Sequence, residues 1–255
     1  MTAPATSPAG SYWAASRAPR YSLVFVIPLF LLYEALAAAL AGVPGTASVR
    51  NAADVLLKSP FLAFAGPRGS MAFFALVIGV CVYFIARDIT RSRKRLEPRV
   101  FALMLGESAV LGLLLGAVVG ALTQRLLGGL SALSLQTGAV PLEAMPWTAK
   151  LMLSLGAGLY EELLFRVLLV GGLAAGLRWL LGIRWVSGVV AAVVGALLFS
   201  LFHYIGQYGD PFDVTSFTYR AVAGLAFSGL YLTRGFGITA WTHALYDVYV
   251  LIIWG

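Results

Sequence analysis

The stretch TAKLMLSLGAGLYEELLFRVLLVGG, residues 148–172, decides how the chain folds. It is apolar and long enough to cross a hydrocarbon core about 30 Å thick as a single helix. Its middle nevertheless carries Glu161, Glu162 and Arg166. Each ionised group near the bilayer centre costs about 2.5–3.5 kcal/mol even on the lenient insertion scale. Three such groups in one membrane helix therefore indicate a functional or structural role that offsets this cost.

The composition of the whole chain agrees with a membrane location. Of the 255 residues, 60% are hydrophobic and 11% are charged, and the mean hydropathy is +0.87. Soluble domains carry about 25% charged residues, so we predict an integral protein of the lipid bilayer. The net charge of +7 does not indicate a nucleic-acid partner, because most basic residues lie in short loops beside apolar segments. The single cysteine, Cys81, leaves no disulfide framework.

The apolar segments predict an all-α, polytopic transmembrane helical bundle with about seven spans and a catalytic site within the last four. We expect residues 1–20 to be a flexible N-terminal tail, residues 21–147 to form accessory spans and loops, and residues 148–255 to form the catalytic core. Before the short second span, residues 51–65 are open to two interpretations, an amphipathic surface helix or a re-entrant element. The predicted spans are Tyr21–Gly42, Met71–Ala86, Val100–Thr123, Thr148–Gly172, Val186–Ile205, Ser216–Thr233 and Phe236–Trp254.

The loops between these spans predict an orientation. The basic segment RDITRSRKRLEPR, Arg87–Arg99, is expected on the cytoplasmic side, because cytoplasmic loops carry an excess of lysine and arginine. The segment YGDPFD, Tyr208–Asp213, falls on the opposite side and has acids but no basic residue. The N-terminus is therefore predicted inside and the C-terminus outside.

Other polar or small residues in the spans predict packing. Gly112, Gly116 and Gly120 repeat every four residues, which favours close approach of a second helix. Glu34 and Glu107 are expected to be structural, because an intramembrane acid can simply find a polar partner. No long internal repeat is visible, which weakens a transporter built from duplicated halves.

The two adjacent glutamates are predicted to differ in role. Glu162 and Arg166 lie four residues apart, so on a helix they share a face and can form a structural ion pair. Glu161 is rotated about 100° from its neighbour and is left outside that pair. A carboxylate without a permanent partner is a candidate general base.

The chain has two histidines, His203 and His243, and both fall in late apolar spans. Phe199 precedes the first by four residues, and Asp247 follows the second by four, so each pair is expected to share a helix face. A lone intramembrane histidine is often a packing residue of the bundle. Ionisable residues in three separate spans, however, favour a functional site. Walker, dinucleotide-binding, HExxH and GxSxG motifs are all absent.

These residues form an ordered set of three motifs. EELLFR (161–166) matches EExxxR, FSLFH (199–203) matches FxxxH, and HALYD (243–247) matches HxxxN/D. The set resembles the CPBP family of type II CAAX prenyl proteases and bacteriocin-processing enzymes over residues 148–254. The resemblance implies an intramembrane glutamic endopeptidase with an all-α fold, which hydrolyses a peptide bond of a protein or peptide substrate. The location it suggests is a bacterial inner membrane.

The resemblance also implies a role for each motif residue. Glu161 would activate a water molecule together with His203, with no metal or other cofactor. His243 and Asp247 would face the oxyanion. The supporting positions fall on Glu162 and Arg166, and on Phe199 in the second motif.

One position departs from the family pattern. Family members often have asparagine where this chain has Asp247, and an ionised aspartate can only accept hydrogen bonds. Asp247 must therefore either stay protonated or orient His243 while that ring donates to the oxyanion. We expect the orienting role.

Two alternatives remain open on the sequence. A zinc protease could use Glu161, His203 and His243 as ligands, because three protein ligands and a water form a legitimate catalytic zinc site. A non-catalytic scaffold or a proton-coupled transporter could use the same buried acids. The sequence does not name the substrate, which could be a membrane-anchored or C-terminally processed protein.

Overall fold

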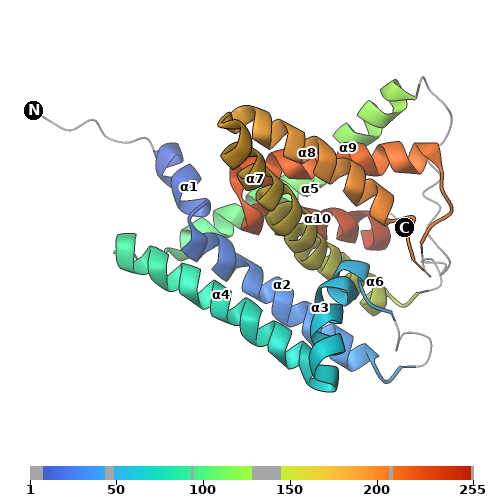
Figure 1. Ribbon diagram of the computed structural model, residues 1–255, viewed down its shortest axis with the longest axis horizontal. Helices are drawn as coiled ribbons and strands as arrows, with labels where there is room; N and C mark the ends of the chain where they lie inside the picture. Colours follow the sequence, from blue (N-terminus) through green and yellow to red (C-terminus); the bar gives the residue numbers. More distant parts are fainter. Residues whose placement is uncertain (1–7, 44–48, 93–94, 128–144, 207–208, 254–255) are drawn as a thin grey trace, which may run out of the picture.

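A computed structural model describes residues 8–43, 49–92, 95–127, 145–206 and 209–253. Every regular element within these ranges is a helix (Figure 1), which confirms the predicted all-α fold. The helices are α1 (Pro8–Ser16), α2 (Pro19–Leu40), α3 (Ala52–Ala65), η1 (Gly66–Arg68), α4 (Gly69–Ser92), α5 (Pro98–Leu126), α6 (Trp147–Gly156), η3 (Ala157–Val170), α7 (Gly171–Leu181), α8 (Arg184–Phe202), α9 (Val214–Arg234), α10 (Phe236–Val248) and η4 (Tyr249–Ile253).

The described part of the chain contains six helical stretches that are long and apolar enough to cross a membrane. The protein is therefore an integral membrane protein, with roughly the predicted number of spans. The difference is α9, which is helical as expected but contains Arg220, Arg234 and five serines or threonines, so it is less apolar than the others. The six stretches are Pro19–Leu40, Ala52–Ser92, Pro98–Leu126, Trp147–Leu181, Arg184–Phe202 and Phe236–Ile253.

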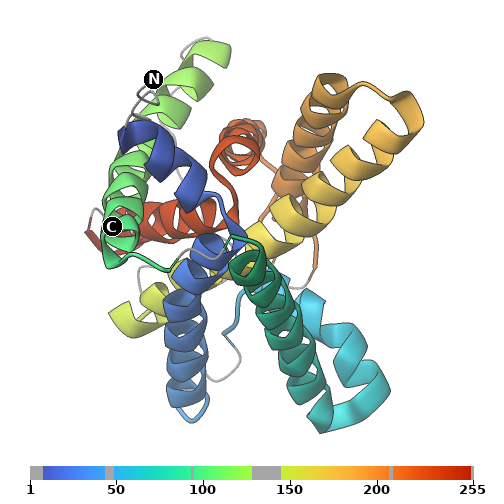
Figure 2. The ribbon, with the colours of Figure 1, turned by 90° about the vertical axis from the view of Figure 1, so that its left-hand side faces the viewer.

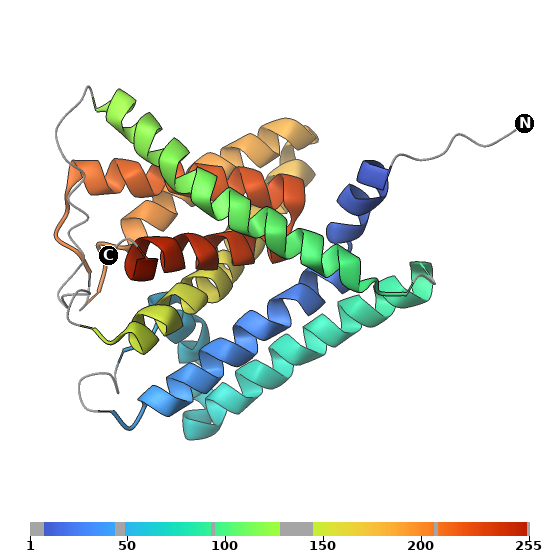
Figure 3. The same ribbon diagram turned by 180° about the vertical axis from the view of Figure 1, so that it is seen from behind.

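Helix α10 lies at the centre of the bundle and packs against α2, α5, α6, α9 and η3. Figure 3 shows α5 crossing α9 and α10. The glycine stripe on α5 accounts for part of this contact. A Cβ at Gly112 would lie 3.2 Å from the carbonyl oxygen of Thr242, and one at Gly116 would lie 3.2 Å from the ring of Tyr246. Gly120 has open space beside it, so the packing prediction holds for two of the three glycines.

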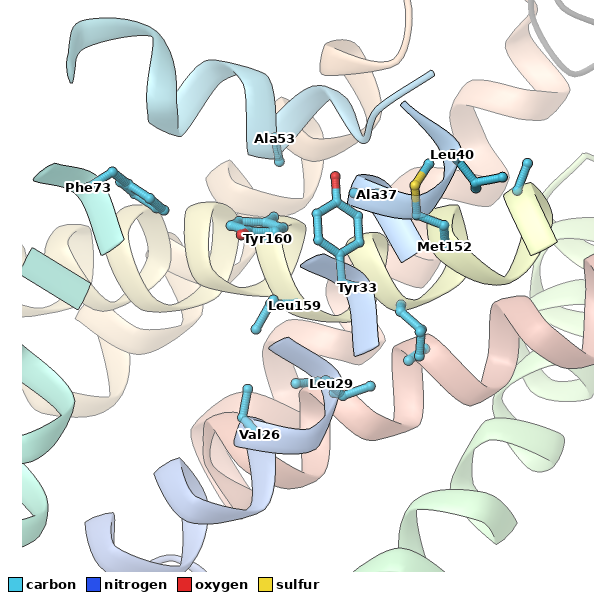
Figure 4. Close-up of a cluster of buried hydrophobic side chains, with 14 residues drawn as sticks. Val26, Leu29, Tyr33, Ala37, Leu40, Ala53, Phe73, Met152, Leu159 and Tyr160 are labelled. Atoms are coloured by element: carbon cyan, nitrogen blue, oxygen red, sulfur yellow. The ribbon is translucent and has the colours of Figure 1, made fainter. Parts of the chain in front are cut away.

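A buried cluster joins α2, α3 and η3 (Figure 4). The rings of Tyr33 and Tyr160 meet edge to face with centroids 5.1 Å apart, and Phe73 packs beside Tyr160 at 6.4 Å. Leu29 and Met152 are fully buried in the same cluster. Aromatic pairs of this kind add about 0.5–1.5 kcal/mol beyond the area that they bury. The cluster fixes one side of η3, next to Glu161.

Helix α3 presents a buried polar face to α2, which sets it apart from a surface helix. Asp54 and Lys58 are buried. The Lys58 ammonium lies 2.5 Å from the carboxylate of Asp54 and 2.9 Å from that of Glu34, and Glu34 also accepts a hydrogen bond from Tyr160. Glu34 therefore has the structural role predicted for it, and α3 belongs to the bundle.

The N-terminal segment differs from the predicted flexible tail. Residues 8–16 form α1, which contacts α2 and α5 (Figure 2). Tyr12 donates a 2.5 Å hydrogen bond to Glu107, whose carboxylate also binds Arg234 through two 2.6 Å contacts. The Arg234 guanidinium lies 3.7 Å from the ring centroid of Trp13. A hydrogen bond to Glu107 and a cation-π contact with Arg234 thus hold this helix, and those two residues form a bidentate ion pair with each other. Residues 1–7 lie outside the described ranges.

Gly158 provides a test of how tightly η3 packs on α10. A Cβ at this position would lie 2.4 Å from the carbonyl oxygen of Ala240 and 2.7 Å from the backbone nitrogen of Ala244. We expect Gly158→Ala to destabilise the protein by about 1–3 kcal/mol, because backbone atoms cannot move away as a side chain can. Gly172→Ala is the matched control, since nothing lies within 4 Å of its Cβ. Thermal unfolding in detergent measures both, and equal melting temperatures would contradict the close contact.

Candidate active site

The acidic motif lies on η3, which is a π-helix rather than the α-helix expected from the sequence. At its end the N–H of Gly171 donates to the carbonyl of Arg166, five residues back. π-Helical turns are rare and occur frequently at functional sites. The wider turn changes the angle between successive side chains from the 100° of an α-helix. The contacts of Glu161 and Glu162, and not their spacing, therefore identify their partners.

Both carboxylate oxygens of Glu162 are engaged. One lies 3.1 Å from Nε of Arg166, as the spacing predicts, and the other lies 2.6 Å from Nδ1 of His243 on α10. Glu162 is completely buried and Arg166 is 1% exposed. Because a carboxylate accepts, the Nδ1–H of His243 is the donor. The predicted ion pair is therefore part of a three-residue network that joins η3 to α10.

Asp247 does not make the orienting contact that the sequence analysis assigned to it. Its Oδ2 lies 3.9 Å from Nε2 of His243, which is too far for a hydrogen bond. The His243 ring is instead held by Glu162 at Nδ1 and by Phe227, whose ring stacks on it at 4.4 Å. Asp247 remains a neighbour of the Nε2 edge of His243 without a hydrogen bond to it.

His203 stands immediately after the last residue of α8. Its Nδ1 donates to the carbonyl of Phe199 at 2.9 Å, so in the neutral ring Nε2 is left as an acceptor. The Phe199 ring contacts both histidines, with centroids 4.9 Å from His203 and 6.3 Å from His243. The Arg166 guanidinium lies 4.4 Å from the same ring. The Phe199 ring thus lies beside ionisable side chains from η3, from α10 and from the end of α8.

Glu161 interacts electrostatically with His203, His243 and Arg166. It retains 9% exposure, whereas Glu162 next to it has none. Its Oε1 accepts a 2.8 Å hydrogen bond from the side-chain amide of Asn51. The structure thus brings the two histidines and the two glutamates of the three motifs together, and the direct contacts of Arg166 and His243 go to Glu162.

Asn51 is a residue that the sequence analysis did not place at the site. Asparagine before an apolar helical run is a recognisable N-cap signal, and Asn51 does cap α3. Nothing in the sequence, however, connects it to Glu161, which lies 110 residues further along.

The zinc alternative finds no support in the geometry of the described residues. They contain no group of three or more histidine, cysteine, aspartate or glutamate side chains arranged to hold a metal ion. We therefore derive no step through zinc.

Comparison with known proteins gives one match. Residues 143–249 match the family model described as type II CAAX prenyl endopeptidase, Rce1-like. The match covers less than half of the chain, but it runs through all three motifs and all of α6–α10. No curated protein and no solved structure matches the chain. Over residues 143–249, which hold the acidic motif and both histidines, the chain is thus similar to the Rce1-like type II CAAX prenyl endopeptidases, a family of membrane proteases.

Proposed function

We propose that the protein is an intramembrane endopeptidase in which Glu161 activates the attacking water. One observation carries this assignment. Of two adjacent glutamates, Glu162 has both oxygens engaged by Arg166 and His243, while Glu161 keeps some exposure and interacts with both histidines. A general base needs a lone pair that no permanent cation occupies. Glu161 meets that requirement and Glu162 does not.

The reaction follows from these positions. Glu161 accepts a proton from water, and the water oxygen bonds to the scissile carbonyl carbon while the carbonyl electrons move to its oxygen. The acceptor Nε2 of His203 holds the second hydrogen of the water. When the tetrahedral intermediate collapses, the C–N bond breaks and Glu161 returns its proton to the leaving amine. The enzyme regains its starting state, and one water has been added across the peptide bond.

His243 is assigned to the oxyanion. With a proton on both ring nitrogens, it donates Nδ1–H to Glu162 and keeps Nε2–H for the negative oxygen of the intermediate. Donors fixed in advance are effective because they need no reorganisation during the reaction. The Glu162 contact and the Phe227 stack supply that fixed position.

The substrate class that we propose is a protein or peptide anchored at the membrane by a lipid-modified cysteine near its C-terminus. Support comes from the family description, which names CAAX prenyl endopeptidases, and from a site carried on membrane-spanning helices. The basic segment Arg87–Arg99 supports a cytoplasmic N-terminus in the membrane that we propose, a bacterial inner membrane.

Metal dependence separates this mechanism from the zinc alternative. We expect the purified full chain to cleave a quenched fluorescent peptide ending in a farnesylated CAAX sequence, and to do so equally well after exhaustive chelation. The same peptide without the farnesyl group tests whether the lipid is needed. Stoichiometric zinc in the protein, with activity lost on stripping and restored by zinc alone, would contradict the water-activation role of Glu161. Failure of the folded protein to cleave any peptide would favour a scaffold.

A further inference from the structure

We propose that Asn51 is a positioning residue for Glu161, supplied by a helix that lies outside the segment matched by the protease family. The inference rests on the proposed function, because it concerns the carboxylate to which that function assigns the base. The contact itself is direct: Nδ2 of Asn51 lies 2.8 Å from Oε1 of Glu161, and both side chains are buried within the bundle.

The oxygen and the nitrogen of the Asn51 side-chain amide contact different parts of the protein. Its Oδ1 accepts from the backbone N–H groups of Ala53 at 2.9 Å and Asp54 at 3.4 Å, which caps α3. Its Nδ2 points the other way and donates to Glu161. Because one planar group makes all three contacts, the position of the Glu161 carboxylate is tied to the N-terminus of α3.

Polar contacts hold α3 in place, so the hydrogen bond from Asn51 to Glu161 starts from a fixed position. Tyr33 on α2 donates a 2.8 Å hydrogen bond to Asp54 (Tyr33 is labelled in Figure 4). Lys58 bridges Asp54 and Glu34. On the side of the acidic motif, a Cβ at Gly156 would lie 2.9 Å from Cβ of Asn51. The absence of a side chain at Gly156 therefore lets Asn51 come this close.

The chemistry of an amide suits this task. A donor to an ionised carboxylate forms a charge-assisted hydrogen bond, which is stronger than one between neutral groups. It holds Oε1 and leaves the second oxygen to face the water. An amide cannot take up the proton of the water, so it does not compete with the base. The first turn of α3 adds the positive end of the helix dipole beside the carboxylate.

Asn51→Asp tests the role without removing the cap, because aspartate caps helices as well as asparagine does. The new carboxylate cannot donate, and it brings a negative charge against Glu161. We expect kcat on the farnesylated CAAX peptide to fall about 10- to 100-fold, the usual range for a hydrogen bond to a charged group, with KM unchanged. The acid limb of the pH profile should move to higher pH, because a second negative charge opposes ionisation of the base. The other ionisable groups that interact with Glu161, namely Arg166, His203, His243 and Asp247, stay the same.

Two further variants separate positioning from capping. Asn51→Ser keeps an N-cap but its shorter side chain loses the contact with Glu161, so kcat should fall and the acid limb should move, less than in Asn51→Asp. Asp213→Asn makes the reverse exchange at the N-cap of α9, where Asp213 accepts from the N–H of Ser216 at 2.7 Å. That control should keep the parent kcat and pH profile. If Asn51→Asp unfolds, Asn51→Ser decides.

The outcomes distinguish an error in the role of Asn51 from an error in the proposed protease function. Parent kcat and pH profile in folded Asn51→Asp or Asn51→Ser, together with an inactive Glu161→Gln, would overturn the role of Asn51 alone. An active Glu161→Gln would overturn the function itself. A loss of melting temperature with unchanged kcat per folded molecule would show that Asn51 only caps α3.

Discussion

Glu161→Gln is expected to abolish cleavage of the farnesylated CAAX peptide while the protein still inserts and folds. Glutamine has the same shape and can keep a contact with Asn51, but its amide cannot accept the proton of the water. General-base catalysis contributes about 10²–10⁴-fold, so kcat should fall at least that far. Single-turnover assays in detergent or liposomes measure the residual rate. Cleavage at the parent rate by the purified variant would disprove the assignment.

Glu162→Gln, the same substitution at the adjacent residue, is the comparison variant for that experiment. This change leaves Arg166, which is 1% exposed, without its carboxylate and weakens the contact with His243. Breaking a buried pair by removing one partner costs about 3–5 kcal/mol. We therefore expect a clear loss of thermal stability and yield in Glu162→Gln and none in Glu161→Gln. Equal melting temperatures for the two variants would contradict the division of roles between the two glutamates.

His243→Ala is expected to lower turnover about 10²–10³-fold, the usual effect of losing one oxyanion donor. Asp247→Asn should keep or improve turnover, because an amide beside the Nε2 edge can donate to the same oxygen. Asp247→Ala should cost less than His243→Ala, since Glu162 and Phe227 still hold the ring. The measurement is kcat of each variant on one peptide, with folding checked by thermal unfolding.

The opposite ranking would change the mechanism. If Asp247→Asn is as inactive as His243→Ala while both remain folded, the acid itself is needed. Asp247 would then belong to the proton-transfer groups. The 3.9 Å separation between its Oδ2 and Nε2 of His243 would have to close during the reaction.

The apolar pattern was sufficient for the helical fold, because a chain in lipid must satisfy its backbone groups within helices. It also located the helix that carries Glu161 and Glu162. The pattern failed at α1, where Tyr12 and Trp13 sit in a segment rich in alanine, serine and proline. What orders this helix is the Arg234–Glu107 pair, whose members lie far along the chain. Contacts of that kind leave no local signal.

In the candidate site, too, the sequence predicts contacts within one helix and misses contacts between helices. Spacing predicted the Glu162–Arg166 pair, which lies within one helix, and the structure contains it. Spacing could not show that Glu162 also reaches His243, or that Asn51 reaches Glu161, because those contacts depend on how separate helices are rotated against one another. The π-helix of η3 likewise has no signature in the composition of its residues.

The dispersal of the site along the chain has a consequence for biosynthesis. Ribosomes deliver Asn51 first, then Glu161 and His203, and His243 comes last on α10, the helix at the centre of the bundle. At about 5–20 residues per second, His243 emerges about 10–40 s after Asn51. Throughout that interval the nascent protein carries the proposed base, Glu161, without the histidine assigned to the oxyanion. With the roles proposed above, we expect cleavage by the unfinished chain to be about 10²–10³-fold slower until the last helix arrives.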